Sequence, residues 1–418
     1  MNLKKIIGLS DYKTFAGPSW PSLDDIISGI PAADPLIQKE VEEFVDMMKQ
    51  TYFDITIDGT ILANNNQQRQ KQIFFDKNYH EHPICHVPWN TMGVNNNGEV
   101  FICSSPSWIP KFVGNILHAD DVYDVLNSES AQRIRQEIIA GRYFYCNNQI
   151  CNFFGQVDPK KYHSAPQLDH QPLEFVSQEQ LLVSEIPKNL IFDFDYTCNF
   201  RCPSCRTDLI NNNKHHVIRS INDQIVTKIK HLVIDKIQSQ PIEIRWGGGE
   251  TFISDVYVEL LEYILATNKQ NIKHIIQTNG SYLRSKSEML EKLLPTLQEL
   301  RISFDAATEE TYKKIRINGQ WNQLLENVKW VQHIIEKNQH PLRLTADFVV
   351  QLDNYKEIPA FVKLCDQLGI NKINFQKMWN WGTWPTEIFD QKNIYNPDHP
   401  QYNELVEVFK LADRKILF

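Results

Sequence analysis

The sequence predicts an α/β protein in which a small α+β module rich in cysteine precedes a partial (β/α)6 barrel. Two patterns favour this fold. From residue 189 onward, short apolar segments alternate with amphipathic helical segments, which is typical of a parallel sheet built from βα units. Seven of the eight cysteines lie within residues 85–205, so they cluster around the start of this alternation.

The composition sets the broad class of the protein. Its 418 residues are enough for two or three domains, and no apolar run reaches the roughly 18 to 20 residues of a membrane span. The formal net charge is −8, and no long basic run offers phosphates a binding surface. Asp11 follows the first apolar run too closely for a secretion signal. We therefore expect a soluble, cytoplasmic protein that binds neither membranes nor nucleic acid.

The chain before residue 189 falls into three segments. Residues 1–84 are mixed, with an amphipathic helix expected over 35–53, and the sequence assigns them no role. Residues 85–154 form the cysteine module, with a hairpin turn expected at residues 95–98 and a helix over 128–140 that begins with a serine cap. Residues 155–188 are rich in Pro, His and Gln and are expected to form a linker.

Residues 189–418 form the predicted barrel, which is of the TIM type and ends in a C-terminal helix. Its six strands are expected over residues 189–195, 242–246, 274–278, 300–305, 342–351 and 372–377. The helices between them include residues 222–237, 255–267 and 320–337. Six units favour an open, partial barrel over a closed barrel of eight, and in both the active-site groups gather at the carboxyl ends of the strands.

A cysteine motif follows the first of these strands directly. Cys198, Cys202 and Cys205 have the spacing CxxxCxxC. Three thiolates on one short loop can hold three corners of an iron-sulfur cube and leave the fourth iron open to another ligand. The alternatives are a zinc site or an incidental cluster, although structural zinc usually takes four ligands in paired CxxC spacing.

The loop FDFDYTCNFRCPSCRTD resembles the signature loop of the radical S-adenosylmethionine (radical SAM) superfamily. The resemblance implies that these three cysteines bind a [4Fe-4S] cluster whose open iron is chelated by the amino and carboxylate groups of SAM. One electron then cleaves SAM to methionine and a 5′-deoxyadenosyl radical, which abstracts a hydrogen atom from the substrate. Ser204 stands where the family usually has an aromatic residue that packs near the adenine.

A run of three glycines follows the second strand, in a chain that has only 16 glycines. A polyglycine turn lets backbone carbonyls approach an ammonium group closely, and a carboxylate beside it can balance the charge. RWGGGETF also resembles the GGE motif of the superfamily, which assigns Gly248, Gly249 and Glu250 to the SAM amino group. Thr251 replaces the proline that is common after the glutamate.

Small polar residues end the third and fourth strands, where they are suited to bonding ribose hydroxyls or the methionine carboxylate. The alternative is ordinary turn and cap chemistry. The resemblance places Ser303 and Asp305 on the ribose-contacting strand and Arg316 where many members carry an arginine. The candidate SAM contacts after the glycine motif are therefore Thr278, Asn279, Ser303, Asp305, Arg316 and Gln351.

Four further cysteines lie in the module before the barrel: Cys85, Cys103, Cys146 and Cys151. They supply the ligands of one more cluster, and a tetrahedral zinc site is the alternative because it would use the same four thiolates. The segment CHVPWNTMGVNNNGEVFIC resembles the auxiliary-cluster modules called SPASM or twitch domains, which more often follow the barrel. The resemblance implies one auxiliary cluster, and so two [4Fe-4S] clusters in the chain.

Two aspartates alternate on the first strand. Asp193 and Asp195 are candidate catalytic acids or bases if they face the cavity, and structural groups otherwise. After the sixth strand, Trp379, Trp381 and Trp384 are expected to pack in the core, with a substrate channel as the alternative. Cys365, within an apolar helical pattern, is expected in the core.

The sequence therefore predicts a radical SAM enzyme with an N-terminal twitch-like module. By analogy with the auxiliary-cluster branch, its expected substrate is a peptide or protein residue, and its expected electron donor is a reductase such as flavodoxin or ferredoxin. Modification of a small metabolite or sugar is an alternative. A noncatalytic zinc or iron-sulfur scaffold is the alternative from a different class.

Overall fold

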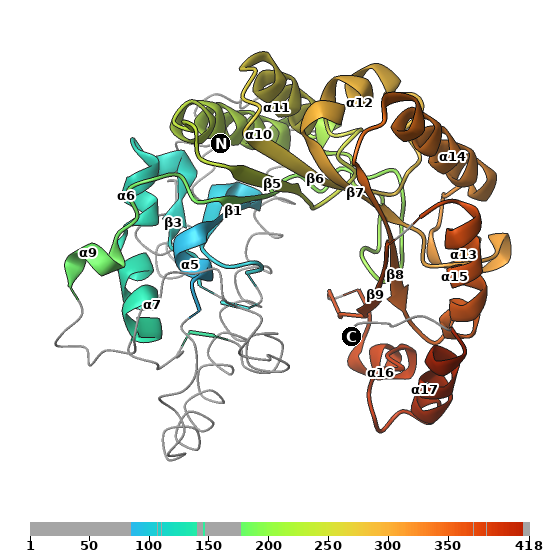
Figure 1. The fold of residues 1–418 in the computed structure, drawn as a ribbon. Helices are drawn as coiled ribbons and strands as arrows, with labels where there is room; N and C mark the ends of the chain where they lie inside the picture. The colour runs from blue at the N-terminus through green and yellow to red at the C-terminus, as the bar shows by residue number, and fades with distance from the viewer. Residues whose placement is uncertain are drawn as a thin grey trace, which may run out of the picture. The chain divides into compact units, whose positions relative to one another are not determined.

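The computed structural model describes residues 85–106, 108–109, 111–139, 145–146, 177–370, 372–381 and 383–412. The helix expected over 35–53, most of the expected linker and Cys151 lie outside these residues. The chain divides into two compact units. The first holds residues up to 194 together with 214–242, and the second holds residues 195–213 and 243–418 (Figure 1).

The first unit contains four strands in the order β3-β2-β1-β4. β1 (Thr91–Asn95) and β2 (Glu99–Phe101) pair antiparallel, with β3 (Gly114–Asn115) beyond β2. Asn97 and Gly98 join the first two strands with φ angles of 62° and 78°, a left-handed backbone that Asn and Gly tolerate best. The hairpin expected at residues 95–98 is therefore confirmed. β1 also pairs parallel with β4 (Asn189–Asp193).

Short helices pack around a buried arginine in this unit. They are α5 (Val87–Asn90), α6 (Val122–Leu126), α7 (Glu129–Ile139) and α9 (Gln178–Leu181). The Arg135 guanidinium of α7 is fully buried and donates to the carbonyl oxygens of Pro88, Leu126 and Leu181 at 2.8 to 3.1 Å. One side chain thus joins all four helices, because it satisfies the carbonyls of three others.

The second unit carries the remaining strands in the order β5-β6-β7-β8-β9. These are β5 (Ile242–Trp246), β6 (Ile272–Thr278), β7 (Leu297–Ser303), β8 (Arg343–Val350) and β9 (Lys372–Lys377). The pairs β6-β7, β7-β8 and β8-β9 are parallel. With β4, all six predicted strands are present within a few residues of their expected bounds, so the α/β fold with a parallel, partial barrel is confirmed.

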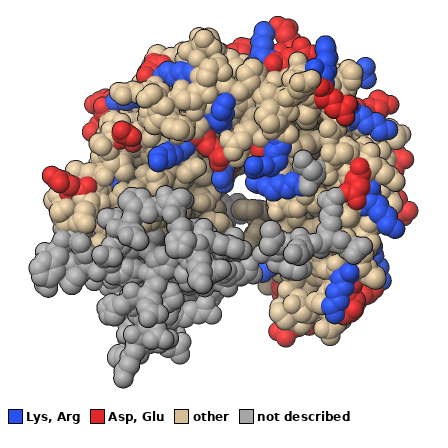
Figure 2. Space-filling view, in the orientation of Figure 1, with Lys and Arg blue, Asp and Glu red and all other residues tan. Residues whose placement is uncertain are grey.

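Helices cover one face of these strands (Figure 1). They include α11 (Asp255–Ala266), α12 (Ser287–Leu293), α13 (Glu309–Ile315), α14 (Trp321–Asn338) and α15 (Ile358–Gln367). α16 (Thr386–Lys392) and α17 (Tyr402–Leu411) follow β9. Alternate strand residues such as Leu300, Ile302 and Ala346 are fully buried, as expected for the helix-covered face. Lys and Arg are interspersed with Asp and Glu over the visible outer surface (Figure 2).

The structure also decides two expectations about single side chains. Cys365 is fully buried in α15, which confirms a core position. Trp379 and Trp381 are 44% and 62% exposed, so core packing is wrong for these two residues. They follow the end of β9, where the chain has left the sheet. Across the described helices, none is long and apolar enough to span a bilayer.

Candidate active site

The loop after β4 carries three cysteines that are not in disulfides, and each sulfur lies near a hydrogen-bond donor. The Cys198 amide donates to the Ile210 carbonyl at 2.9 Å, and the Cys205 amide donates to the Cys202 carbonyl at 2.9 Å, which closes the loop on itself. The three sulfurs accept from Asn279 Nδ2 at 3.9 Å (Cys198), from an Arg316 nitrogen at 3.6 Å (Cys202) and from an Arg206 nitrogen at 3.5 Å (Cys205).

Two opposing influences act on these thiols. Burial raises the pKa of Cys198 to about 11 and also raises that of Cys202, while the nearby guanidinium groups favour the thiolates. Among the described residues, no three His, Cys, Asp or Glu side chains meet at one metal position. An iron-sulfur cube does not require that meeting, because each thiolate binds a different iron. The donor set therefore fits a cluster that replaces the thiol protons.

Arg206 is a site residue that the sequence reasoning missed. Its guanidinium donates to the Tyr196 carbonyl at 2.7 Å and to the Gly248 carbonyl at 3.4 Å, in addition to the Cys205 sulfur. It thus ties the cysteine loop to the glycine turn. The signal in the sequence was an arginine directly after the third cysteine.

The glycine turn after β5 packs backbone against backbone. The Gly249 and Glu250 amides donate to the carbonyls of Asp195 and Thr197 at 2.9 and 2.7 Å. A Cβ on Gly249 would lie 2.1 Å from the Thr197 carbonyl oxygen, and Gly248 has a φ of 85°. Only glycine fits both positions, which explains why the chain places its glycines together here.

Glu250 lies with two of the predicted SAM contacts. It is 1% exposed and accepts from Thr278 Oγ1 and from the Asn279 amide, both at 2.7 Å. Burial raises its pKa to about 7, although both bonds favour the carboxylate. A buried carboxyl with this pKa ionises readily when a cation approaches, which fits the assignment of Glu250 to the SAM amino group.

Asp305 and Arg316 form a buried ion pair. Asp305 has a φ of 59°, and its Oδ2 lies 2.7 Å from an Arg316 nitrogen while its Oδ1 accepts from the Val349 amide at 2.7 Å. The structure therefore brings Asp305 to Arg316 and, through Arg316, to Cys202. A ribose contact for Asp305, and for the buried Ser303 at the end of β7, stays a prediction.

Gln351 presents a buried amide without a partner. The side chain is 3% exposed, and its Nε2 has no hydrogen-bond partner within the part of the chain that the structure describes. Its backbone amide donates to Asn354 Oδ1 at 2.8 Å, which fixes the residue at the end of β8. A buried donor left open in this way fits a bound ligand.

The two candidate catalytic aspartates differ sharply. Asp195 is buried and accepts from Thr197 (amide and hydroxyl), from Asn212 Nδ2 at 2.7 Å and from the Ser254 hydroxyl. These bonds favour the structural alternative. Burial raises the pKa of Asp193 to about 7, and its Oδ1 has no partner among the described residues, so a catalytic role for Asp193 stays a prediction.

The auxiliary cysteines belong to the first unit. Cys103 and Cys146 are buried and Cys85 is half-buried. Since Cys151 lies outside the described residues, the four-cysteine ligand set stays a prediction.

Known protein families match both the cysteine module and the barrel segment that follows it. Residues 194–364 match the radical SAM superfamily. Residues 85–152 match the iron-sulfur cluster-binding domain called SPASM. The two matches include all seven cysteines of residues 85–205 and the glycine turn.

Curated relatives match part of the chain. A probable GTP 3′,8-cyclase of Saccharolobus solfataricus is 22% identical over 230 residues, which are 54% of this chain and 68% of the relative. A probable GTP 3′,8-cyclase of Methanocaldococcus jannaschii is 26% identical over 175 residues, 41% of this chain and 53% of the relative.

Among solved structures, the match with archaeal TYW1 covers 47% of this chain and 62% of the TYW1 chain, with 18% sequence identity and a TM-score of only 0.28. The family matches instead agree with the geometry of the cysteine loop and the glycine turn. The chain is an enzyme with a radical SAM domain over residues 194–364 and an SPASM iron-sulfur cluster-binding domain before it, over residues 85–152.

Proposed function

We propose that the protein cleaves SAM reductively and abstracts a hydrogen atom from its substrate. The observation that carries this proposal is the set of three cysteine sulfurs, each beside its own donor, in the same unit as the Glu250 group. A [4Fe-4S] cluster bound there supplies the electron, and SAM supplies the 5′-deoxyadenosyl radical.

The side chains of this unit hold the reactants. Cys198, Cys202 and Cys205 ligate the cluster, and Arg206 and Arg316 favour their thiolate state. Glu250 and the glycine turn bind the SAM amino group. Thr278 and the Asn279 amide hold the Glu250 carboxyl in place, and the open Gln351 amide bonds a polar group of SAM.

The substrate we favour is a small metabolite. The matched relatives carry the name of cyclases that act on GTP, and neither reported name denotes a peptide-modifying enzyme. The peptide or protein residue expected from the auxiliary-cluster analogy thus lacks this support. We further propose one auxiliary cluster on Cys85, Cys103, Cys146 and Cys151, and a cytoplasmic reductase such as flavodoxin or ferredoxin as electron donor.

The first test is 5′-deoxyadenosine formation from SAM by anaerobically reconstituted, reduced protein. We expect formation by the wild type and none by the variant in which Cys198, Cys202 and Cys205 are all replaced by Ala. Equal formation by that variant would overturn the proposal. A fully iron-loaded wild type that binds no SAM would overturn it too, and bound zinc without SAM turnover would favour the scaffold alternative.

A further inference from the structure

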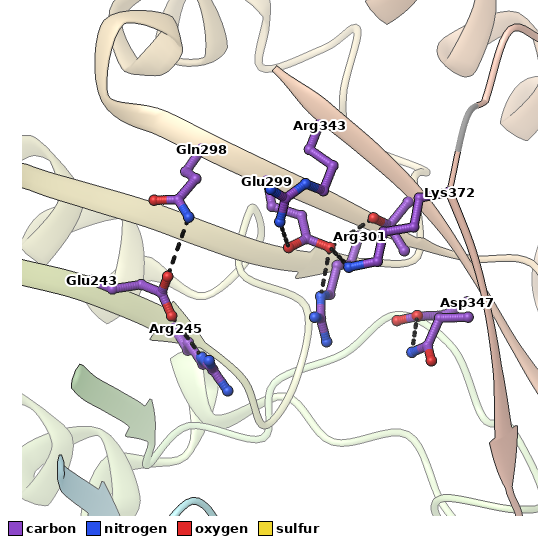
Figure 3. Close-up of polar contacts among 10 residues, drawn as sticks. Glu243, Arg245, Gln298, Glu299, Arg301, Arg343, Asp347 and Lys372 are labelled. Atoms are coloured by element: carbon purple, nitrogen blue, oxygen red, sulfur yellow. Dashed lines mark hydrogen bonds and ion pairs between the residues drawn. The ribbon is translucent and has the colours of Figure 1, made fainter. Parts of the chain in front are cut away.

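The face of β5–β9 opposite the covering helices, called here the inner face, carries charged residues in cross-strand rows (Figure 3). Glu299 pairs with Arg343 in the first row. Arg301, Thr345 and Lys372 form the second row, and Ser303, Asp347 and Asn374 form the third. Parallel pairing places these residues on one face, since side chains alternate with a period of two.

Glu299 contacts every other residue of the first two rows. It is buried and accepts from the Thr345 hydroxyl at 2.6 Å. Among the described residues it also pairs with Arg301 at 3.1 Å, Arg343 at 3.3 Å and Lys372 at 3.3 Å. Although burial raises the pKa of Glu299, these groups hold it below its ordinary range. One buried carboxylate therefore faces three cations, and even with the Asp347 carboxylate of the third row counted, three cations face two carboxylates.

This excess is open to solvent. The Glu299 side chain is 2% exposed, whereas those of Arg301, Arg343 and Lys372 are 29%, 49% and 42% exposed. The neighbouring pair Arg245 and Glu243 is balanced, with 3.0 Å between Nε and Oε1. A solute that approaches the inner face at Glu299 therefore meets cationic groups rather than the carboxylate.

Asp347, in the third row, has an open acceptor. Its Oδ1 accepts from Asn374 Nδ2 at 2.8 Å. Burial raises the pKa of this carboxyl and the nearby Gln376 side chain lowers it, but its buried Oδ2 has no donor at full hydrogen-bond geometry among the residues the structure describes. The residue is 1% exposed, and its side chain points to the same side of the sheet as Arg301 in Figure 3. A buried carboxylate oxygen left without a donor is unfavourable, so a ligand that donates to it would be bound.

The three rows lie at different distances from the predicted SAM-binding residues. The Asp347 carbonyl accepts from the Asp305 and Phe304 amides, so the third row borders the Asp305–Arg316 pair. The second row lies two residues earlier on each strand, about 7 Å away at the rise of extended chain. The Asp347 acceptor is thus nearer the SAM-binding residues, and the cationic groups lie farther from them.

We infer that the substrate is a small anion whose phosphate or carboxylate binds Arg301, Arg343 and Lys372, and whose hydroxyl or amine donates to Asp347. The inference rests on the proposed function and names the substrate class for that reaction. Arginine suits this role because its planar fork binds both anions in a bidentate manner. The Asp347 contact would place the neutral part of the substrate toward SAM.

The test uses three probes on anaerobically reconstituted full-length protein with SAM present: inorganic phosphate, succinate and ribose 5-phosphate. Calorimetric titration should show binding of phosphate or succinate, and the tighter of the two identifies the anion. We expect Arg301→Gln and Arg343→Gln each to weaken that binding about tenfold, as for loss of a charge-assisted bond. Arg284→Gln is the matched control, because Arg284 is exposed and lies outside these rows.

Asp347→Asn tests the second contact separately. This variant should weaken ribose 5-phosphate binding more than inorganic phosphate binding, because only the sugar phosphate is long enough to bring a hydroxyl to Asp347 while its phosphate is bound to the cationic rows, about 7 Å away. An equal loss for both probes would overturn the Asp347 assignment. Absence of anion binding in the wild type, or unchanged binding in both arginine variants, would overturn the inference. The same preparations are assayed for 5′-deoxyadenosine without added anion: the control variant Arg284→Gln should retain uncoupled SAM cleavage, and failure of the proposed function would show as no cleavage in the wild type.

Discussion

The Arg316 guanidinium contacts both a buried carboxylate and a cysteine sulfur. It lies between Asp305 Oδ2 at 2.7 Å and the Cys202 sulfur at 3.6 Å, and the Asp305 side chain is 1% exposed. A buried charge that loses its partner is strongly unfavourable. The pair therefore matters for stability as well as for the thiolate state of Cys202.

Replacing Arg316 with Gln should lower the free energy of unfolding by about 3 to 5 kcal/mol, because it strands the Asp305 carboxylate. Denaturant unfolding of the anaerobic protein measures the change. The double variant Arg316→Gln, Asp305→Asn should recover part of the loss. If the single and double variants lose the same stability, the pair does not interact as its geometry indicates.

The raised pKa of Asp193 predicts how the free energy of unfolding changes with pH. Its pKa is raised from 3.8 to about 7 by burial, so the folded protein holds a proton that the unfolded chain releases. The stability that the folded protein has with this carboxyl protonated is fully present below pH 3.8, and it is lost as the pH rises toward 7. Asp193→Asn should remove the loss, so the variant should gain about 2 to 3 kcal/mol over wild type between pH 5 and pH 8.

Unfolding at the two pH values measures this difference, and Asp195→Asn is the comparison. Asp195 accepts from four donor groups, so its variant should be destabilised at both pH values. A pH-independent difference between Asp193→Asn and wild type would contradict the burial of an uncompensated carboxyl at this position.

Sequence reasoning identified the site residues that belong to motifs and missed those that depend on register. The CxxxCxxC and GGGE runs are local, so Cys198 and Glu250 were identifiable. Asp347 pairs with Ser303, one row along from Arg301, only because β7 and β8 pair in one register, and Glu299 pairs with cations from three strands for the same reason. No local pattern in the sequence contains that pairing.

At the scale of elements, the strands were predictable because each is a short apolar run between helical segments. The start of α10 (His216–Lys228) was not, and it lies six residues before the predicted start at residue 222. The ring of His215 accepts from the Ile218 amide at 3.4 Å and caps this helix. Histidine is outside the usual group of N-cap residues, Ser, Thr, Asp and Asn, so the signal was absent.

The glycine turn after β5 gives a prediction at this scale. Gly249→Ala would place a Cβ against the Thr197 carbonyl, so the turn must shift away from residues 195–197. We expect a loss of about 1 to 3 kcal/mol in stability and at least a tenfold weaker SAM affinity, because Glu250 moves with the turn. Unfolding and equilibrium SAM binding measure the two effects.

Gly369→Ala is the matched control. Gly369 also has a positive φ, of 69°, but a Cβ there meets only the end of the Gln332 side chain. This variant should lose about 1 to 2 kcal/mol from left-handed strain and keep wild-type SAM affinity. Equal SAM affinity in both glycine variants would separate the turn from SAM binding.

For the whole molecule, the two family matches predict that iron belongs to two separate parts of the chain. Cys85→Ala should remove about four irons per chain if the module holds one cluster, and uncoupled SAM cleavage should partly persist. Iron analysis and low-temperature electron paramagnetic resonance measure this. Cys365→Ala, in the core of α15, should leave the iron content unchanged. Unaltered iron in Cys85→Ala would exclude Cys85 as a ligand.

The parallel pairing of β1 with β4 has a consequence for biosynthesis. Thr91 and Asn189 are register partners about 100 residues apart, so the ribosome releases the module strand long before its partner. At about 5 to 20 residues per second, β1 waits roughly 5 to 20 s with its β4 edge open. Such an edge invites pairing with other nascent chains, and we expect aggregation during overexpression to begin there. Slower synthesis would lengthen that exposure, whereas an early chaperone on the module would protect it.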